Sequence, residues 1–181
     1  MTFRLRLAIA AALVVAVSVA VASIVVRPLM PADAEPARAL LGNIFRGTAY
    51  LERMNEVLES ALQFEDPEYL CLLAAPHEDD APDGLVLFGT ILGARLATKV
   101  HAVVSRDPLV QLALVDAVRE TCRHSGERLV ICELPNDPPF DVSAIALAAR
   151  GFREEGRVDD LVRDGVALRL LVWRPGEESD A

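Results

Sequence analysis

The sequence RGFREEGRVDDLVRDGVALRLLVW, residues 150–173, is the most informative stretch of the chain. Its second residue is Gly151, and glycine commonly ends helices because it tolerates a left-handed backbone. Two strand-like runs follow, Phe152–Val158 and the apolar Val166–Trp173, and the polar segment Asp159–Gly165 separates them. Such runs on either side of turn residues predict the end of a helix followed by two strands and a connecting turn.

Short strands and helices alternate through the rest of the chain. Strands are expected at Ser23–Leu29, Tyr69–Ala75, Gly84–Leu92, Arg95–Ser105 and Arg128–Leu134, and helices from Pro31, over Tyr50–Leu62, from Pro108 to Gly126 and over Asp141–Arg150. The order is therefore β-α-α-β-β-β-α-β-α-β-β. It predicts one α/β domain over residues 23–175, with a mixed sheet and helices on both faces, followed by an acidic tail at 176–181.

The chain begins with a hydrophobic segment. Residues 7–26 carry no charge and follow two arginines. Residues 7–22 are compatible with a membrane anchor, with a signal peptide cleaved near Ala22, or with a misassigned start codon. We accordingly expect a cytoplasmic protein, either free or anchored through this segment, with an exported protein as the alternative.

Charge and cysteine content exclude some functions. The formal net charge is −9, and all 27 acidic residues lie after residue 30. A domain this acidic does not offer the basic surface that nucleic-acid binding requires. Cys71, Cys122 and Cys132 lie in apolar runs at spacings that fit no metal site, so we expect reduced core cysteines and no bound metal.

Three strings in this order resemble the GNAT family of acetyl-CoA-dependent N-acetyltransferases. They are VVRPLMPADAEPARALL (25–41), VVSRDPLVQLALVDAVRETCRHSGERLVICEL (103–134) and the closing string at 150–173. The first is similar to the family's opening strand and helix. The second lies where the family keeps its cofactor motif, and the third is similar to its Gly-Phe pair and last two strands.

This resemblance implies a mixed, mostly antiparallel sheet that splays between its fourth and fifth strands. It also implies transfer of an acetyl group from acetyl-CoA to an amine, either a small molecule or a peptide N-terminus, in a chain that is a candidate homodimer. By the same resemblance, the backbone of Val103 and Val104 lies beside the thioester. A loop at the next helix start would hold the diphosphate, since free N–H groups there attract anions.

That loop departs from the family pattern Q/R-x-x-G-x-G/A, which aligns with Arg106–Gln111. Arg106 fits the first position, but Leu109 and Gln111 replace the two glycines. Both side chains are expected to project where the diphosphate approaches bare backbone.

Asp107 and Pro108 weaken the same site further. Asp is a favourable N-cap, so its carboxylate is expected to accept from the N–H of Leu109 or Val110, which a phosphate would otherwise use. The carboxylate also repels an incoming anion, and proline supplies no N–H at all. We therefore expect diphosphate binding to be weakened or lost.

The residues that would act as acid and base also depart from the family pattern. The family's tyrosine before the Gly-Phe pair is replaced by Leu147, and neither Tyr50 nor Tyr69 is expected to substitute for it. His101 is the best-placed candidate base on the fourth strand. Glu133, at the end of the fifth strand, is a candidate to orient the amine or to act through a water.

Two functions therefore remain open. One is an active N-acyltransferase in which these residues and the Arg106–Gln111 loop act. The other is a catalytically inactive GNAT-fold binding or regulatory module, tethered to a membrane in one version.

Overall fold

The computed structural model describes residues 15–17, 24–48, 50–63, 68–78 and 80–177. Eight strands form one sheet in the order β1-β2-β3-β4-β5-β6-β8-β7, and every neighbouring pair is antiparallel except β5 and β6. The strands are β1 (Val15–Val17), β2 (Ile24–Pro28), β3 (Tyr69–Ala75), β4 (Gly84–Thr90), β5 (Ala97–Ser105), β6 (Leu129–Pro135), β7 (Arg153–Arg163) and β8 (Val166–Trp173).

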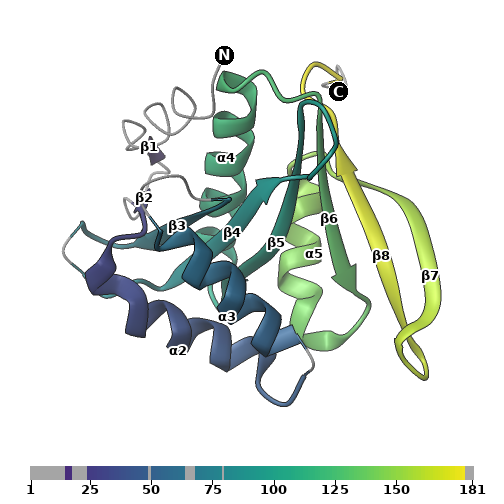
Figure 1. Ribbon diagram of the computed structural model, residues 1–181, viewed down its shortest axis with the longest axis horizontal. Helices are drawn as coiled ribbons and strands as arrows, with labels where there is room; N and C mark the ends of the chain where they lie inside the picture. Colours follow the sequence, from purple (N-terminus) through teal and green to yellow (C-terminus); the bar gives the residue numbers. More distant parts are fainter. Residues whose placement is uncertain (1–14, 18–23, 49, 64–67, 79, 178–181) are drawn as a thin grey trace.

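Helices cover both faces of this sheet, as expected (Figure 1). The four α-helices are α2 (Ala34–Phe45), α3 (Tyr50–Ala61), α4 (Pro108–His124) and α5 (Asp141–Ala149), with short 3₁₀ turns at Pro31–Asp33 and Pro138–Phe140. Helices α2 and α3 contact each other and lie on one face, whereas α4 and α5 pack together on the other. The predicted mixed α/β sheet is confirmed.

The last hairpin differs in detail from the sequence prediction. Strand β7 continues to Arg163, so the turn is shorter than the expected Asp159–Gly165 segment. Pairing with β8 is irregular after Val158 and resumes at Arg163, opposite Val166. The strand absorbs the polar residues as a bulge, which is the usual way for an antiparallel edge to accommodate extra residues.

The hydrophobic start lies mostly outside the described residues, including the expected cleavage point near Ala22. Within it, Val15–Val17 form a strand that pairs with β2. Among the residues that the structure describes, no helix combines the length and apolar character needed to cross a bilayer.

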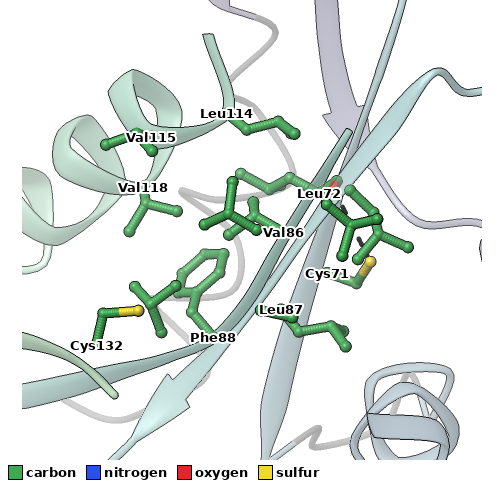
Figure 2. Packing of buried hydrophobic residues seen from close by; sticks show 14 of the residues in the cluster. Cys71, Leu72, Val86, Leu87, Phe88, Leu114, Val115, Val118 and Cys132 are labelled. Carbon is green, nitrogen blue, oxygen red and sulfur yellow. Dashed lines mark hydrogen bonds between the residues drawn. The ribbon is translucent and has the colours of Figure 1, made fainter. Parts of the chain in front are cut away.

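A continuous apolar core fills the space between the sheet and its helices. Figure 2 shows Leu114, Val115 and Val118 of α4 facing Val86 and Phe88 of the sheet. Leu114 is fully buried, and Val115 and Val118 are at most 2% exposed. Burial of this stripe is the main force that holds α4 against the sheet.

All three cysteines are free thiols within this core. Burial raises the pKa of Cys122 and of Cys132 to about 12, and it raises the pKa of Cys71 further. They are structural side chains, as the sequence predicted.

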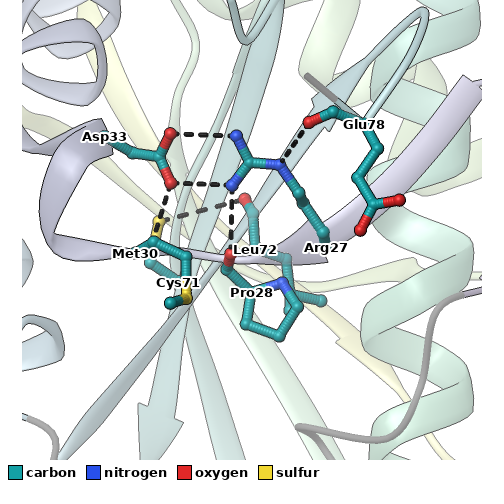
Figure 3. A network of polar contacts seen from close by, with 7 residues as sticks. All are labelled: Arg27, Pro28, Met30, Asp33, Cys71, Leu72 and Glu78. Atoms are coloured by element: carbon teal, nitrogen blue, oxygen red, sulfur yellow. Dashed lines mark hydrogen bonds and ion pairs between the residues drawn. The ribbon is translucent and has the colours of Figure 1, made fainter. Parts of the chain in front are cut away.

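An ion pair links β2 to the start of the first helical layer (Figure 3). The Arg27 guanidinium donates to both carboxylate oxygens of Asp33, at 2.7 and 2.9 Å, and its Nε donates to the Glu78 carbonyl at 3.2 Å. Asp33 also accepts from the Met30 backbone N–H at 2.9 Å. This arrangement keeps the pKa of Asp33 below its usual value, chiefly through the hydrogen bonds from Arg27.

Candidate functional site

The sheet opens between β5 and β6. The two strands pair in parallel over four residue pairs, from Ala97 opposite Leu129 to Val100 opposite Cys132. Beyond these pairs β5 continues to Ser105 and β6 to Pro135 without further pairing to each other. This is the splay expected between the fourth and fifth strands of the domain, and it is confirmed.

Helix α5 closes one side of this opening. The Ser143 hydroxyl donates to the Val103 carbonyl at 3.0 Å, and both residues are buried. A buried carbonyl on the strand that has parted from β6 is thereby hydrogen-bonded by a side chain, so the separated strands remain compatible with a dry interior.

A cavity of about 220 Å³ lies at the opening, on the face covered by α2 and α3. Its charged and polar side chains come from α3, β5 and β6, and its apolar lining includes Phe45 and Phe140, whose ring centroids are 5.7 Å apart. The lining residues with polar side chains are Tyr50, Arg53, Lys99, His101 and Glu133. The structure therefore brings the two predicted catalytic residues, His101 and Glu133, into one cavity.

His101 is half-buried and packs edge-on against the Tyr69 ring, with centroids 5.1 Å apart. Burial, reinforced by the positive charges of Lys99 and Arg53, lowers the pKa of His101 to about 4. The imidazole is therefore neutral near pH 7. The neutral ring can accept a hydrogen bond from an amine. With so low a pKa, however, it binds a proton too weakly to remove one effectively from an alkylammonium group.

Glu133 is bound to the neighbouring strand. Its Oε2 accepts from Lys99 Nζ at 2.7 Å, and the carboxylate side chain stays 41% exposed. That exposure leaves part of the carboxylate open to the cavity and to water. Glu133 therefore retains the capacity to accept a proton or to hold an ammonium group.

Tyr50 lies at the cavity, although the sequence did not place it there as a substitute for the family's acid. Its side chain lines the same cavity as Val103 and Glu133. Burial, and secondarily the Glu133 carboxylate, raises the pKa of Tyr50, so its hydroxyl keeps its proton at neutral pH. A protonated phenol beside the splay is a suitable proton donor.

A second cavity, of about 390 Å³, lies beside the start of α4. Asp107 is the N-cap of that helix, as predicted, and its Oδ1 accepts from the Leu109 N–H at 2.8 Å. The Gln111 N–H donates to the Asp107 carbonyl at 3.1 Å, and Pro108 has no N–H. Of the first four helical residues, all of them described, only Val110 has a backbone N–H with no such partner.

The remaining loop residues divide into exposed and buried positions. Arg106 is exposed and lines the second cavity together with buried Val104, and Leu109 is 55% exposed. Gln111 corrects the prediction, because its side chain is only 2% exposed and points inward. Its Nε2 donates to the Ser105 carbonyl at 2.7 Å, which braces the end of β5.

The two cavities differ in how well they suit the parts of acetyl-CoA. The opened strands and their cavity fit a narrow thioester arm. The start of α4 does not fit a diphosphate, because one free N–H remains and the Asp83 and Asp107 carboxylates border the cavity. Arg106 is the cation available there to oppose them. Within the described residues, no group of three or more His, Cys, Asp or Glu is arranged to hold a metal ion.

The strand order, the splay and the two helical layers define the fold of the GNAT acetyltransferases. Solved structures agree. A candidate GNAT acetyltransferase from Desulfovibrio desulfuricans superposes with a TM-score of 0.71 at 18% identity, over 84% of this chain and 99% of its own. A GCN5-related N-acetyltransferase from Kribbella flavida gives 0.69 at 15% identity, over 84% and 98%. A candidate acetyltransferase from Salmonella typhimurium, solved with acetyl-CoA, gives 0.65 at 12% identity, over 88% and 98%.

At these identities the likeness establishes the fold alone. A scan of protein-family models and a search of curated protein sequences each give no match to the chain.

Sequence reasoning missed three polar residues of the first cavity: Tyr50, Arg53 and Lys99. A signal existed for α3, because Tyr50 and Arg53 are three residues apart and so lie near each other on one side of the helix. For Lys99, its alternation with His101 along β5 puts both on one face of the strand. The sequence did not show on which face of the sheet α3 packs.

Proposed function

We propose that this chain is an N-acyltransferase that moves an acetyl group from acetyl-CoA to a small amine or a peptide N-terminus. One observation carries the proposal: the sheet opens beyond Val100 and Cys132 directly beside a 220 Å³ cavity that contains proton donors and acceptors. Acetyl-CoA, when bound, supplies a thioester. The backbone of Val103 and Val104 is the proposed contact for its arm.

Three side chains have proposed roles. Glu133 holds the ammonium form of the substrate and accepts its proton, directly or through a water. His101, neutral because of its lowered pKa, accepts a hydrogen bond from the amine and keeps the lone pair directed toward the splay. Tyr50 gives its proton to the departing sulfur, a role supported by its raised pKa and its position in the cavity.

The proposed affinity for the cofactor is low. Arg106 is the main proposed contact for the diphosphate, the Val110 N–H is the one backbone donor left at the described helix start, and Leu109 is exposed nearby in sequence. Gln111 contributes indirectly, by holding the Ser105 carbonyl. A bidentate guanidinium contact offsets part of the repulsion from Asp107 but does not replace a row of amides.

A second candidate function, a non-catalytic binding module, is favoured by the hydrogen bond from Leu109 to Asp107. That bond consumes a donor at the place where an active enzyme would hold the diphosphate. Under this alternative the first cavity binds an amine ligand without turnover.

Calorimetric titration of CoA into the full chain separates the two candidates. We expect binding with a Kd near the millimolar range, lost in Arg106→Ala and kept in the exposed control Arg95→Ala. Acetyl-CoA incubated with a panel of amines should then release thiol, more slowly in Tyr50→Phe. Absence of CoA binding at millimolar concentration overturns the transferase and leaves the binding module.

A further inference from the structure

The first cavity carries more positive than negative charge, although the whole chain carries a formal net charge of −9. Arg53 of α3 and Lys99 of β5 line it, and Glu133 of β6 is the one carboxylate among the lining residues. Tyr50 and His101 are neutral there at pH 7. An amine alone is a poor match for such a lining, since two cations repel its ammonium form.

The two cations differ in how firmly they are already paired. Lys99 Nζ lies 2.7 Å from Glu133 Oε2 and its side chain is 28% exposed, so Lys99 is already paired, while the 41% exposed Glu133 side chain remains accessible to a ligand. Arg53 pairs with Glu56 at 2.9 Å, but both side chains are more than half exposed. An exposed pair within one helix contributes little, so a ligand carboxylate can replace Glu56 at small cost.

The Arg53 side chain is also held beside the cavity from the sheet. Its Nη2 donates to the Tyr69 hydroxyl at 3.2 Å, and the guanidinium carbon lies 5.9 Å from the Tyr69 ring centroid. Gly89 leaves room for that ring, because a Cβ at residue 89 would come within 2.6 Å of Tyr69 Cδ1. The guanidinium is therefore partly preorganised rather than free in solvent.

The rest of the lining is apolar. Phe45, Met54 and Phe140 are each 5% exposed and border the cavity, and Leu168 of β8 lies across from them. A lining of this kind favours a ligand with an apolar body and a few charged groups at fixed positions.

We propose that the acceptor is an amine that also carries a carboxylate, joined to an apolar body of amino-acid size. Arg53 binds the ligand carboxylate, Glu133 holds its ammonium group, and the phenylalanine-lined floor takes the apolar part. The inference rests on the proposed function only in naming this ligand as the acceptor, since the binding itself needs no acyl donor.

Three small molecules test this pairing of charges by calorimetry with the full chain and no acyl-CoA. L-Phenylalanine carries both charges, phenethylamine lacks the carboxylate, and 3-phenylpropionate lacks the amine. We expect L-phenylalanine to bind about tenfold more tightly than phenethylamine or 3-phenylpropionate, because each charged contact removed weakens binding by roughly this factor. Arg53→Gln should reduce the affinity for L-phenylalanine to that for phenethylamine, whereas Arg128→Gln, at the opposite end of β6, should change nothing.

Equal affinity for phenethylamine and L-phenylalanine overturns the proposal, as does an unchanged preference in Arg53→Gln or no binding of any of the three. The outcomes remain distinct from those of the transferase test. Binding of L-phenylalanine without any thiol release removes the transferase and keeps this site. Thiol release with phenethylamine in preference to L-phenylalanine keeps the transferase and removes this site.

Discussion

The Asp107 carboxylate accepts a hydrogen bond from the Leu109 N–H at 2.8 Å, at the first turn of α4. The helix thus begins with an internal anion. An N-cap of this kind stabilises a helix start by about 1 kcal/mol. The same group blocks the most favourable position for an external diphosphate, so helix stability and anion binding are in competition at this point.

Asp107→Ser should separate these two effects. Serine keeps the neutral capping hydrogen bond and removes the charge, so CoA should bind at least about tenfold more tightly, while the free energy of unfolding changes by only a few tenths of a kcal/mol. Calorimetry and urea denaturation measure the two quantities. Asp164→Ser, in the β7–β8 turn, is the matched control for charge. Unchanged CoA affinity in Asp107→Ser would show that the carboxylate does not limit binding.

The Arg27–Asp33 ion pair should make stability depend on pH in the acid range. Since the folded-state pKa of Asp33 is lowered, its contribution is present above the unfolded value near 4 and is lost as the pH falls through the folded value. Asp33→Asn should cost about 2 kcal/mol at pH 7, because the hydrogen bonds from Arg27 lose their charged acceptor, and should flatten the decline below pH 4. Urea denaturation from pH 7 to pH 2.5 measures both. Parallel pH profiles for Asp33→Asn and the wild-type chain would contradict this assignment.

His101 should titrate at about pH 4, which NMR of its ring protons can follow directly. Because the folded state favours the neutral ring, its contribution to stability is complete above the unfolded pKa near 6.5 and falls as the pH drops toward 4. The loss amounts to about 2–3 kcal/mol after allowance for partial solvent access. His101→Gln should remove this slope, whereas His124→Gln, at an exposed helix end, should keep it. A measured pKa near 6.5 for His101 would restore it as a candidate base.

Ser143 should be needed to stabilise the opened strands. Ser143→Ala leaves the buried Val103 carbonyl without its 3.0 Å hydrogen bond, so we expect a loss of about 1–3 kcal/mol in the free energy of unfolding. Ser60→Ala on α3, where no side-chain hydrogen bond holds the hydroxyl within the described residues, is the control. Equal stability of the two variants would mean that water replaces the hydroxyl at Val103.

The order of elements could be predicted because local signals marked it. Asp107-Pro108 identified the start of α4, and the apolar run Tyr69–Ala75 matches β3 at both ends. The length of β7 could not be predicted, because pairing across the bulge by Arg163 and Val166 depends on the partner strand. Composition alone favoured a longer turn there.

Only part of the candidate site could be predicted from the sequence. His101 and Glu133 lie on adjacent strands, so the predicted strand order already placed them near each other. Tyr50 reaches the same cavity through the packing of α3, which no local sequence pattern encodes. Gln111 was misjudged despite an available signal: it is three, four and seven residues before Leu114, Val115 and Val118, so it shares their buried face.

The four residue pairs between β5 and β6 are the whole of the strand-pairing seam between two half-sheets, and the Lys99–Glu133 side-chain hydrogen bond also crosses it. Strands β1 to β5 form one half and β6 to β8 the other. A small rotation about that seam changes the width of the wedge between the halves while every hydrogen bond inside each half stays intact. A rotation of this kind would strain the Ser143–Val103 hydrogen bond, so the present width of the wedge is held by a buried side-chain contact as well as by strand pairing.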